Sequence, residues 1–201
     1  MNEYFDITSS EVSALIEYAA LSYSKNLTNA KGGNVSIRYG EGMIISGTNT
    51  CLRSLGENSL VYVSMDAKTL FSVDGIKPSK EFMMHLAIYK ARPDVNSVFH
   101  LHPPASTAVS AMPGEFPVTT ESAREKLPVL PKVPYAPAGS MELANSLEAI
   151  VKTESISLCG ALLENHGIIA FGSTPETAFN TAELIEASAT NLIYKKILGI
   201  L

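Results

Sequence analysis

The tripeptide His100-Leu101-His102 restricts what this chain can fold into more than any other stretch of its sequence. It closes an apolar run that begins at Val95 and is rich in residues that favour strands. Side chains two residues apart on a strand point to the same face of a sheet, so both imidazoles can bind one metal ion. Taken alone, the pair also fits two ordinary histidines at a strand end.

A third histidine favours the metal site. His166 follows the apolar residues Leu162 and Leu163, so three of the four histidines in the chain end apolar runs. Three histidines and a carboxylate are typical of catalytic zinc, with one position open or shared with substrate. We therefore predict that His100, His102 and His166 bind one metal ion.

Composition limits the class of protein. With 201 residues, 46% of them hydrophobic and 17% charged, the chain should form one globular domain over residues 1–201. A net charge of −5 without a basic block argues against a nucleic-acid surface. Cys51 and Cys159 have no metal-like spacing and suit a reducing compartment. Residues 1–6 do not resemble a signal peptide and no run could span a bilayer, so we expect a cytoplasmic protein without membrane contact.

Periodicity and turn signals predict a mixed sheet flanked by helices. The pattern Thr8-Ser9-Ser10-Glu11 is typical of a capping box and predicts a helix to about Lys25. The proline-rich segment 113–140 is predicted to be irregular and to form a surface or subunit contact. Further helices are expected to begin near residues 79, 105, 141 and 174, with strands at 34–38, 43–46, 60–64, 68–73, 95–102, 157–163 and 167–171.

Two further stretches could contribute to a site. Ser79 is predicted to cap a helix that carries Glu81 in its first turn, where a carboxylate either suits the helix dipole or acts as a general base near the metal. His85, one turn later, is predicted to pack or to support the ligands. The Gly32-Gly33 turn could hold a phosphate on its N–H groups, with Asn34 adding an amide donor, although such a turn is usually only a turn.

Five motifs occur in the order found in the class II aldolase/adducin family, which this chain resembles from about residue 10 to residue 199. The resemblance implies an α/β fold of the α+β type with three layers, in which a central, mainly antiparallel sheet carries helices on both faces. It also implies a cyclic homotetramer. The motifs are Gly33-Asn34-Val35-Ser36, Ser46-Gly47-Thr48, Lys77-Pro78-Ser79-Lys80-Glu81, His100-Leu101-His102 and Glu164-Asn165-His166-Gly167.

The resemblance assigns roles to individual residues. His100, His102, His166 and Glu81 match the ligands of one Zn²⁺ per subunit, a place that another divalent transition metal could take. Glu81 also matches the acid/base group. Three pairs of residues match those that hold a substrate phosphate: Gly33 and Asn34, Thr48 and Asn49, and Ser79 and Lys80. The implied reaction cleaves a ketose 1-phosphate to dihydroxyacetone phosphate and a short aldehyde such as lactaldehyde, through an enediolate stabilised by zinc.

Some positions depart from the aldolases of this family. Lys80 replaces a serine, Asn49 a glycine and Lys31 a threonine, so the bound anion could be a phosphate or a carboxylate. Glu121 stands where those aldolases place a tyrosine that protonates the aldehyde from a neighbouring subunit, and is therefore a candidate second acid/base.

Other chemistry in the family uses the same zinc site. The alternatives are decarboxylation of a sugar-acid phosphate, dehydration of methylthioribulose phosphate and epimerisation of a pentulose phosphate. The epimerases usually have an aspartate at the position of Glu81, which counts against that reaction. Adducin-like scaffolds have lost the ligands, whereas this chain has all of them.

Overall fold

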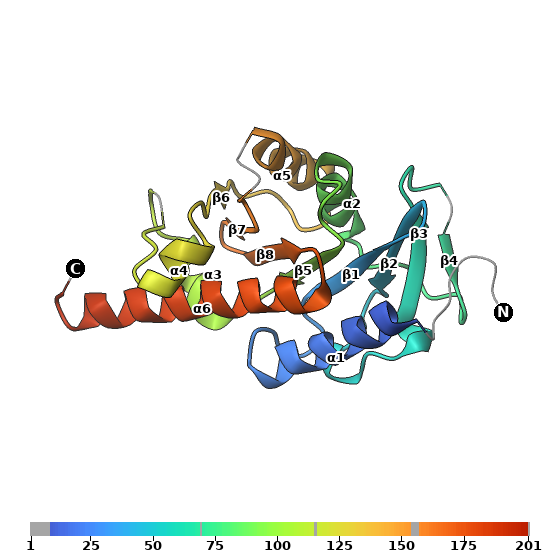
Figure 1. Ribbon diagram of the computed structural model, residues 1–201, viewed down its shortest axis with the longest axis horizontal. Helices are drawn as coiled ribbons and strands as arrows, with labels where there is room; N and C mark the ends of the chain where they lie inside the picture. The colour runs from blue at the N-terminus through green and yellow to red at the C-terminus, as the bar shows by residue number, and fades with distance from the viewer. Residues whose placement is uncertain (1–8, 69, 115, 154–156, 201) are drawn as a thin grey trace.

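The computed structural model describes residues 9–68, 70–114, 116–153 and 157–200. Figure 1 shows a central sheet with helices on either side. The helices are α1 (Ser10–Ser24), α2 (Phe82–Ala91), α3 (Pro104–Ser110), α4 (Glu121–Lys126), α5 (Met141–Thr153) and α6 (Pro175–Ile197), with short 3-10 turns at Leu52–Ser54 and Glu57–Ser59. The strands are β1 (Asn34–Tyr39), β2 (Gly42–Ser46), β3 (Leu60–Ser64), β4 (Leu70–Ser72), β5 (Ser97–Leu101), β6 (Lys132–Val133), β7 (Gly160–Leu163) and β8 (Gly167–Gly172).

The sheet has eight strands in the order β4-β3-β2-β1-β5-β8-β7-β6. Neighbouring strands are antiparallel except β6 and β7, which are parallel. The expectation of a mainly antiparallel sheet between helices is confirmed. In the middle of the sheet β1 pairs with β5, and Asn34 lies opposite His100.

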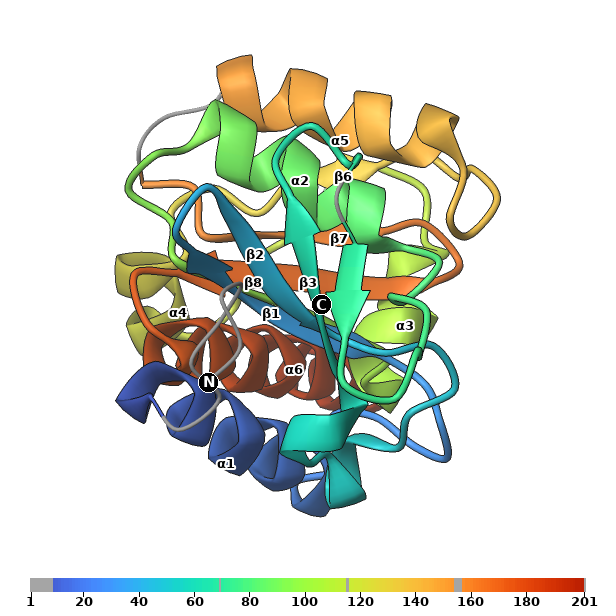
Figure 2. The same ribbon diagram turned by 90° about the vertical axis from the view of Figure 1, so that its right-hand side faces the viewer.

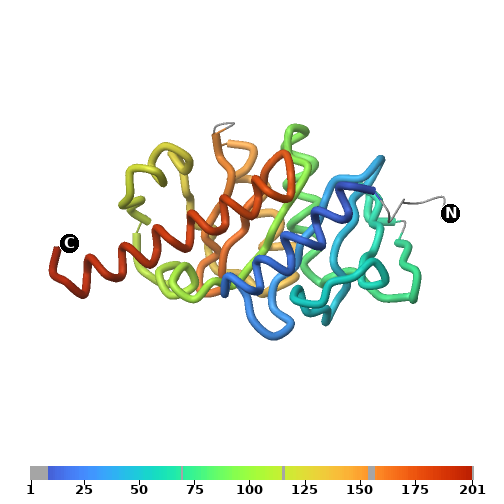
Figure 3. Tube along the Cα trace, turned by 60° about the horizontal axis from the view of Figure 1, so that its bottom comes forward, coloured from blue at the N-terminus to red at the C-terminus, as the bar shows by residue number. Residues whose placement is uncertain are grey.

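Helices α2 and α5 cover one face of the sheet, and α1 and α6 cover the other (Figure 2, Figure 3). Side chains along β5 point alternately to the two helix layers. Phe99 and Leu101 belong to the core under α1 and α6, whereas Val98 belongs to the core under α2 and α5. His100 shares the face of Val98, so the fold directs it toward the helix that follows Glu81.

Helix boundaries differ in two places from those predicted. At α1 the capping residue is Ser9, whose hydroxyl accepts from the Val12 N–H at 3.3 Å, while Thr8 lies outside the described residues. Ser79 lies before the N-cap of α2: its hydroxyl accepts from the Glu81 N–H at 3.3 Å and its carbonyl from the Phe82 N–H at 3.1 Å, so it closes a turn that precedes the helix. The helix begins at Phe82, with Glu81 in the N-cap position.

The segment 113–140 is more regular than predicted. It contains α4 and β6, and the Thr120 hydroxyl caps α4 by accepting from the Ala123 N–H at 3.3 Å. These elements are too short to produce a periodic apolar pattern between so many prolines. The strand expected at 68–73 is β4, with residue 69 outside the described residues, and the strand expected at 157–163 begins at Gly160. Within the described part of the chain, no helix is both long and apolar enough to cross a membrane.

Candidate metal centre and its pocket

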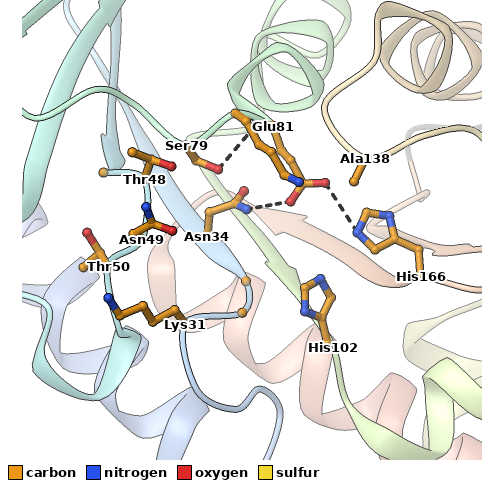
Figure 4. A pocket seen from close by; sticks show the side chains of 14 residues that line it. Lys31, Asn34, Thr48, Asn49, Thr50, Ser79, Glu81, His102, Ala138 and His166 are labelled. Atoms are coloured by element: carbon orange, nitrogen blue, oxygen red, sulfur yellow. Dashed lines mark hydrogen bonds and ion pairs between the residues drawn. The ribbon is translucent and has the colours of Figure 1, made fainter.

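Four side chains from distant parts of the sequence converge where the central strands of the sheet end. His100 is in β5, His102 follows that strand, His166 lies in the turn between β7 and β8, and Glu81 precedes α2. One ligand atom from each lies within 4.8 Å of all the others. Figure 4 shows Glu81, His102 and His166 pointing toward a common point. The sequence prediction of these four residues as neighbours therefore agrees with the geometry.

The orientation of His100 leaves its Nε2 free for a cation. Its Nδ1 donates to the Ile168 carbonyl oxygen at 2.9 Å, so Nε2 carries a lone pair when the ring is neutral. That Nε2 lies 3.0 Å from His102 Nε2 and 3.1 Å from Glu81 Oε2. Lone pairs repel at these distances unless a proton or a metal ion lies between them. A backbone carbonyl that fixes the outer ring nitrogen is also typical of metal-ligating histidines.

The protonation states of the side chains also favour metal binding. Burial and the neighbouring His100 lower the pKa of His102 to about 3 and that of His166 to about 4, so both rings are neutral at pH 7. Neutral imidazole is the form that ligates metals. Burial alone would raise the pKa of Glu81, but the interactions with His100, His166 and Asn34 hold it well below its usual range.

Glu81 also has an unsatisfied atom. Its Oε1 is buried without a hydrogen-bond partner, although His166 Nε2 lies 3.4 Å away. A buried carboxylate oxygen without a partner is costly, and a cation in the cluster would satisfy it. Three imidazoles and one ionised carboxylate thus fit a divalent ion such as zinc.

Glycines let the loops of the site approach the histidines closely. A Cβ at Gly33, which has φ +76°, would lie 2.8 Å from the His100 carbonyl oxygen. A Cβ at Gly32 would lie 2.8 Å from His102 Nδ1, and one at Gly167 would collide with the Leu101 carbonyl. Both glycine motifs in the sequence are therefore needed for packing against the histidine strand, a role that sequence reasoning did not identify.

A pocket of about 350 Å³ adjoins the cluster. The loop after β2 and the loop before α2 are joined along one side of it, because the Thr48 N–H donates to the Lys77 carbonyl at 2.9 Å and Gly47 bridges to Pro78. The residues around the pocket are Lys31, Gly32, Gly33, Asn34, Gly47, Thr48, Asn49, Thr50, Ser79, Lys80, Glu81, His102, Ala138 and His166. All six residues predicted to hold phosphate are among them.

Two residues of positive φ, Asn49 and Gly139, shape the loops around the pocket. Asn49 has φ +59°, a left-handed conformation that asparagine tolerates better than most residues and that explains its place at a glycine position. Ala138 was missed, because it lies in the proline-rich segment. The signal there was Gly139, whose φ is +77° and whose Cβ would lie 2.9 Å from the Lys80 carbonyl oxygen.

The Asn34 side chain is used differently from the prediction. Its Nδ2 donates to Glu81 Oε2 at 3.0 Å, and its Oδ1 lies 2.7 Å from His85 Nε2. It is only 3% exposed, so its amide supports the carboxylate more directly than it could reach a phosphate. His85 is fully buried behind it and is not one of the four clustered ligands, as expected.

Glu121 does not line this pocket. It is the first residue of α4, its side chain is almost fully exposed, and it lies 3.9 Å from Arg124. Any role in proton transfer therefore requires a neighbouring subunit, as the resemblance implied.

Comparison with known proteins identifies the family of the chain. Residues 13–193 match the family model "Class II Aldolase and Adducin N-terminal domain". An L-fuculose phosphate aldolase of Methanococcus maripaludis is 32% identical over 87% of this chain and 91% of its own. The enzyme of that name from Escherichia coli K12 is 33% identical over 81% of this chain and 73% of its own.

Solved structures show the same architecture. An L-fuculose 1-phosphate aldolase superposes with a TM-score of 0.87, covering 98% of this chain and 91% of that one at 24% identity. YgbL of Escherichia coli gives a TM-score of 0.81 at 26% identity, covering 91% of this chain and 88% of its own. With the family model matched over most of its length, this chain belongs to the class II aldolase and adducin family.

Proposed function

We propose that this protein is a zinc-dependent aldolase that cleaves a ketose 1-phosphate similar to L-fuculose 1-phosphate into dihydroxyacetone phosphate and a short aldehyde such as lactaldehyde. The main support for this proposal is that a candidate metal centre and a polar site occur in the same pocket. The histidine–glutamate cluster adjoins loops rich in hydroxyl, amide and ammonium groups. Relatives named L-fuculose phosphate aldolase support the choice of substrate.

The loops suit a phosphate group. Thr48 and Ser79 offer hydroxyl donors, and Lys80 offers a cation, all at the same pocket. A phosphate held there would place the reacting carbons toward the cluster, and its binding energy would be used for orientation. A divalent ion held by the three histidines would polarise the ketone and stabilise the negative charge left by the breaking bond.

Glu81 is the proposed acid/base. It takes the proton from the hydroxyl on C4 of the ketose, the C3–C4 bond breaks, and its electron pair remains on the C3 fragment. The C4 fragment leaves as the aldehyde. Glu81 returns the proton to C3, which gives dihydroxyacetone phosphate. Its depressed pKa keeps the carboxylate ionised at pH 7, which is the form that a general base requires.

Release of dihydroxyacetone phosphate tests the proposal. Protein loaded with zinc is supplied with L-fuculose 1-phosphate, and the product is detected through a coupled dehydrogenase. Chelator-treated protein should lose the activity, and added zinc should restore it. The absence of product from L-fuculose 1-phosphate, together with no condensation of dihydroxyacetone phosphate with lactaldehyde, would reject this substrate class.

A second candidate is decarboxylation of a 3-oxo acid phosphate. Its support is the presence of two lysines at the pocket, Lys31 and Lys80, which could bind a carboxylate in addition to a phosphate. YgbL is named as a candidate aldolase, epimerase or decarboxylase. Carbon dioxide release from a 3-oxo acid phosphate, measured on the same preparation, distinguishes this reaction from aldol cleavage.

Both lysines should contribute to anion binding. Figure 4 shows Lys31 on the side of the pocket that Thr48, Asn49 and Thr50 line, opposite His166. We expect Lys31→Thr and Lys80→Ser each to raise KM about tenfold with little change in kcat, because a hydrogen bond from a charged group is lost. Lys90→Ser removes an exposed lysine of α2 outside the pocket and should leave KM unchanged. A fall in kcat alone would contradict a binding role.

We further propose that the active form is a homotetramer. Two surfaces with apolar lining are found among the described residues. One is a groove of about 740 Å³ whose lining includes Phe116, Val118, Leu127 and Leu130. The other lies at the end of the chain, where Tyr194, Ile197, Leu198 and Ile200 are each more than 60% exposed. Apolar surface of this kind normally marks a contact between proteins.

Light scattering should therefore report a tetramer at micromolar concentration, and a fully active monomer would contradict the proposal. Subunit mixing then tests Glu121 as a second acid/base for the neighbouring site. Glu81→Gln and Glu121→Gln should each be impaired, but their mixed tetramers should recover activity at about a quarter of the sites, where each variant supplies the intact residue. Mixtures as inactive as their components would exclude sharing.

A further inference from the structure

Strand β1 presents a polar face to helix α2, inside an otherwise apolar layer. Asn34, Ser36 and Arg38 alternate along the strand and so share a face. Two residues of strand advance about 6.6 Å and four residues of helix about 6 Å, so these side chains meet successive turns of the helix. The helix side chains that they meet are Glu81 and His85, then His85 and Tyr89, with Arg38 contacting the helix end.

The contacts form one continuous buried chain. Tyr89 Oη lies 2.7 Å from Ser36 Oγ, and Ser36 Oγ lies 2.7 Å from His85 Nδ1. His85 Nε2 lies 2.7 Å from Asn34 Oδ1, and Asn34 Nδ2 donates to Glu81 Oε2 at 3.0 Å. Ser36 and His85 are fully buried, and Tyr89 is almost so. At the far end, Arg38 donates to the carbonyls of Tyr89 and Arg92, at 2.8 and 3.1 Å.

Chemistry fixes the direction of every bond in this chain. An ionised carboxylate only accepts, so Asn34 must turn its NH₂ group toward Glu81 and its oxygen toward His85. His85 Nε2 must then carry a proton. Full burial favours the neutral ring, in which Nδ1 accepts from the Ser36 hydroxyl. The Ser36 oxygen in turn accepts from the Tyr89 hydroxyl. Reversing any one bond would place two acceptors or two donors face to face in a buried site.

We propose that His85 is a positioning residue that holds the Asn34 amide so that it binds Glu81 Oε2, keeps this oxygen beside His100 in the cluster and leaves Oε1 for the reacting proton. The geometry favours Oε1 for that role, because it is buried without a hydrogen-bond partner and faces His166. The same Asn34 lies opposite His100 in the sheet, so the two side chains share the face that carries the cluster. The inference rests on the proposed role of Glu81 at a metal centre.

Two substitutions of His85 test the roles of its two ring nitrogens separately. In His85→Gln the side-chain NH₂ can occupy the position of Nε2 and still donate to Asn34. In His85→Asn the shorter amide can reach only the position of Nδ1, so Asn34 loses the donor that fixes its orientation. Both variants place an amide in the same buried space, which makes them a matched pair.

Binding of Co²⁺, followed by its visible absorption, gives a readout that does not depend on the substrate. We expect His85→Asn to weaken Co²⁺ binding by at least about tenfold, the usual effect of removing a residue that supports a ligand, and His85→Gln to stay within about threefold of the parent. With an active substrate, kcat should follow the same order while KM stays nearly constant, because the phosphate loops are untouched. Equal effects of the two variants on metal binding and kcat would overturn the proposal.

Further variants guard against simple misfolding. Tyr89→Phe removes the last hydroxyl of the chain but leaves Ser36 able to donate to His85, so it should lower the melting temperature without weakening Co²⁺ binding. If both His85 variants fail to fold, Asn34→Ala removes the same bond to Glu81 from the other side and should also weaken Co²⁺ binding about tenfold. Unchanged binding in folded Asn34→Ala would refute the role. An inactive parent that shows the expected Co²⁺ pattern would reject the proposed substrate and keep the positioning role.

Discussion

Replacing Glu81 with glutamine should lower kcat by about a hundredfold or more while most of the metal stays bound. Glutamine keeps the size of the side chain, and its carbonyl oxygen can still accept from Asn34 Nδ2 in place of Oε2. What is lost is the basic oxygen at the position of Oε1, which has no other hydrogen-bond partner. Three histidines remain to hold the ion.

The matched control is Glu142→Gln. Glu142 lies exposed in the first turn of α5, where a carboxylate has only the helix dipole to interact with. Its loss should cost under about 1 kcal/mol of stability and leave turnover intact. Steady-state kinetics and metal content on the same preparations decide the matter. If Glu81→Gln turned over as fast as Glu142→Gln, the base would have to be sought elsewhere, beginning with Glu121.

Loss of His100 should have the other large effect. In His100→Ala we expect the bound metal to fall far below one ion per chain and the activity to fall on the order of a thousandfold, since the metal contributes several kcal/mol to the reaction. Elemental analysis of the dialysed variant measures the first result, and zinc-loaded kinetics the second. Unchanged metal stoichiometry would show that the ion binds elsewhere.

Stability provides an independent check. Excess zinc at about 100 times its Kd should stabilise the parent by about 2.7 kcal/mol and the variant much less. His100→Ala also leaves the Ile168 carbonyl without its donor, so the variant itself should be less stable. His102→Ala avoids this problem, because the His102 side chain is only partly buried. Weaker metal binding in His102→Ala without a large stability loss would assign the effect to the metal.

The clustering of the histidines could be predicted from sequence because the patterns that place them are local. Alternation on a strand places His100 and His102 on one face, whatever the rest of the fold does. The apolar runs before His102 and His166 identify strand ends, and the structure has both residues just beyond or at the end of paired strands. Helix α6 was equally clear, since Thr174 and Pro175 mark its start.

Local patterns failed where tertiary contacts decide the conformation. Ser79 has the side chain of a capping residue, but its N–H donates to Ser46 in β2 and its hydroxyl accepts from the Glu81 N–H in a turn before the helix. Asn34 was predicted to add an amide donor for phosphate, but local patterns did not reveal that its Nδ2 and Oδ1 contact a carboxylate 47 residues later and a histidine 51 residues later. Helix α4 is only six residues long, so no apolar period could reveal it.

The sequence by itself thus determined which four side chains cluster, the layered architecture and the family, because strand alternation, turn chemistry and ordered motifs depend on neighbouring residues. Only the tertiary structure decided how Glu81, the proposed acid/base residue, is held. Asn34 and His85 hold Glu81 because two residues of β1 and about one turn of α2 have nearly the same length, so their side chains meet in register. A strand and a helix far apart in the chain must pack before that match exists, and no pattern within either one contains it.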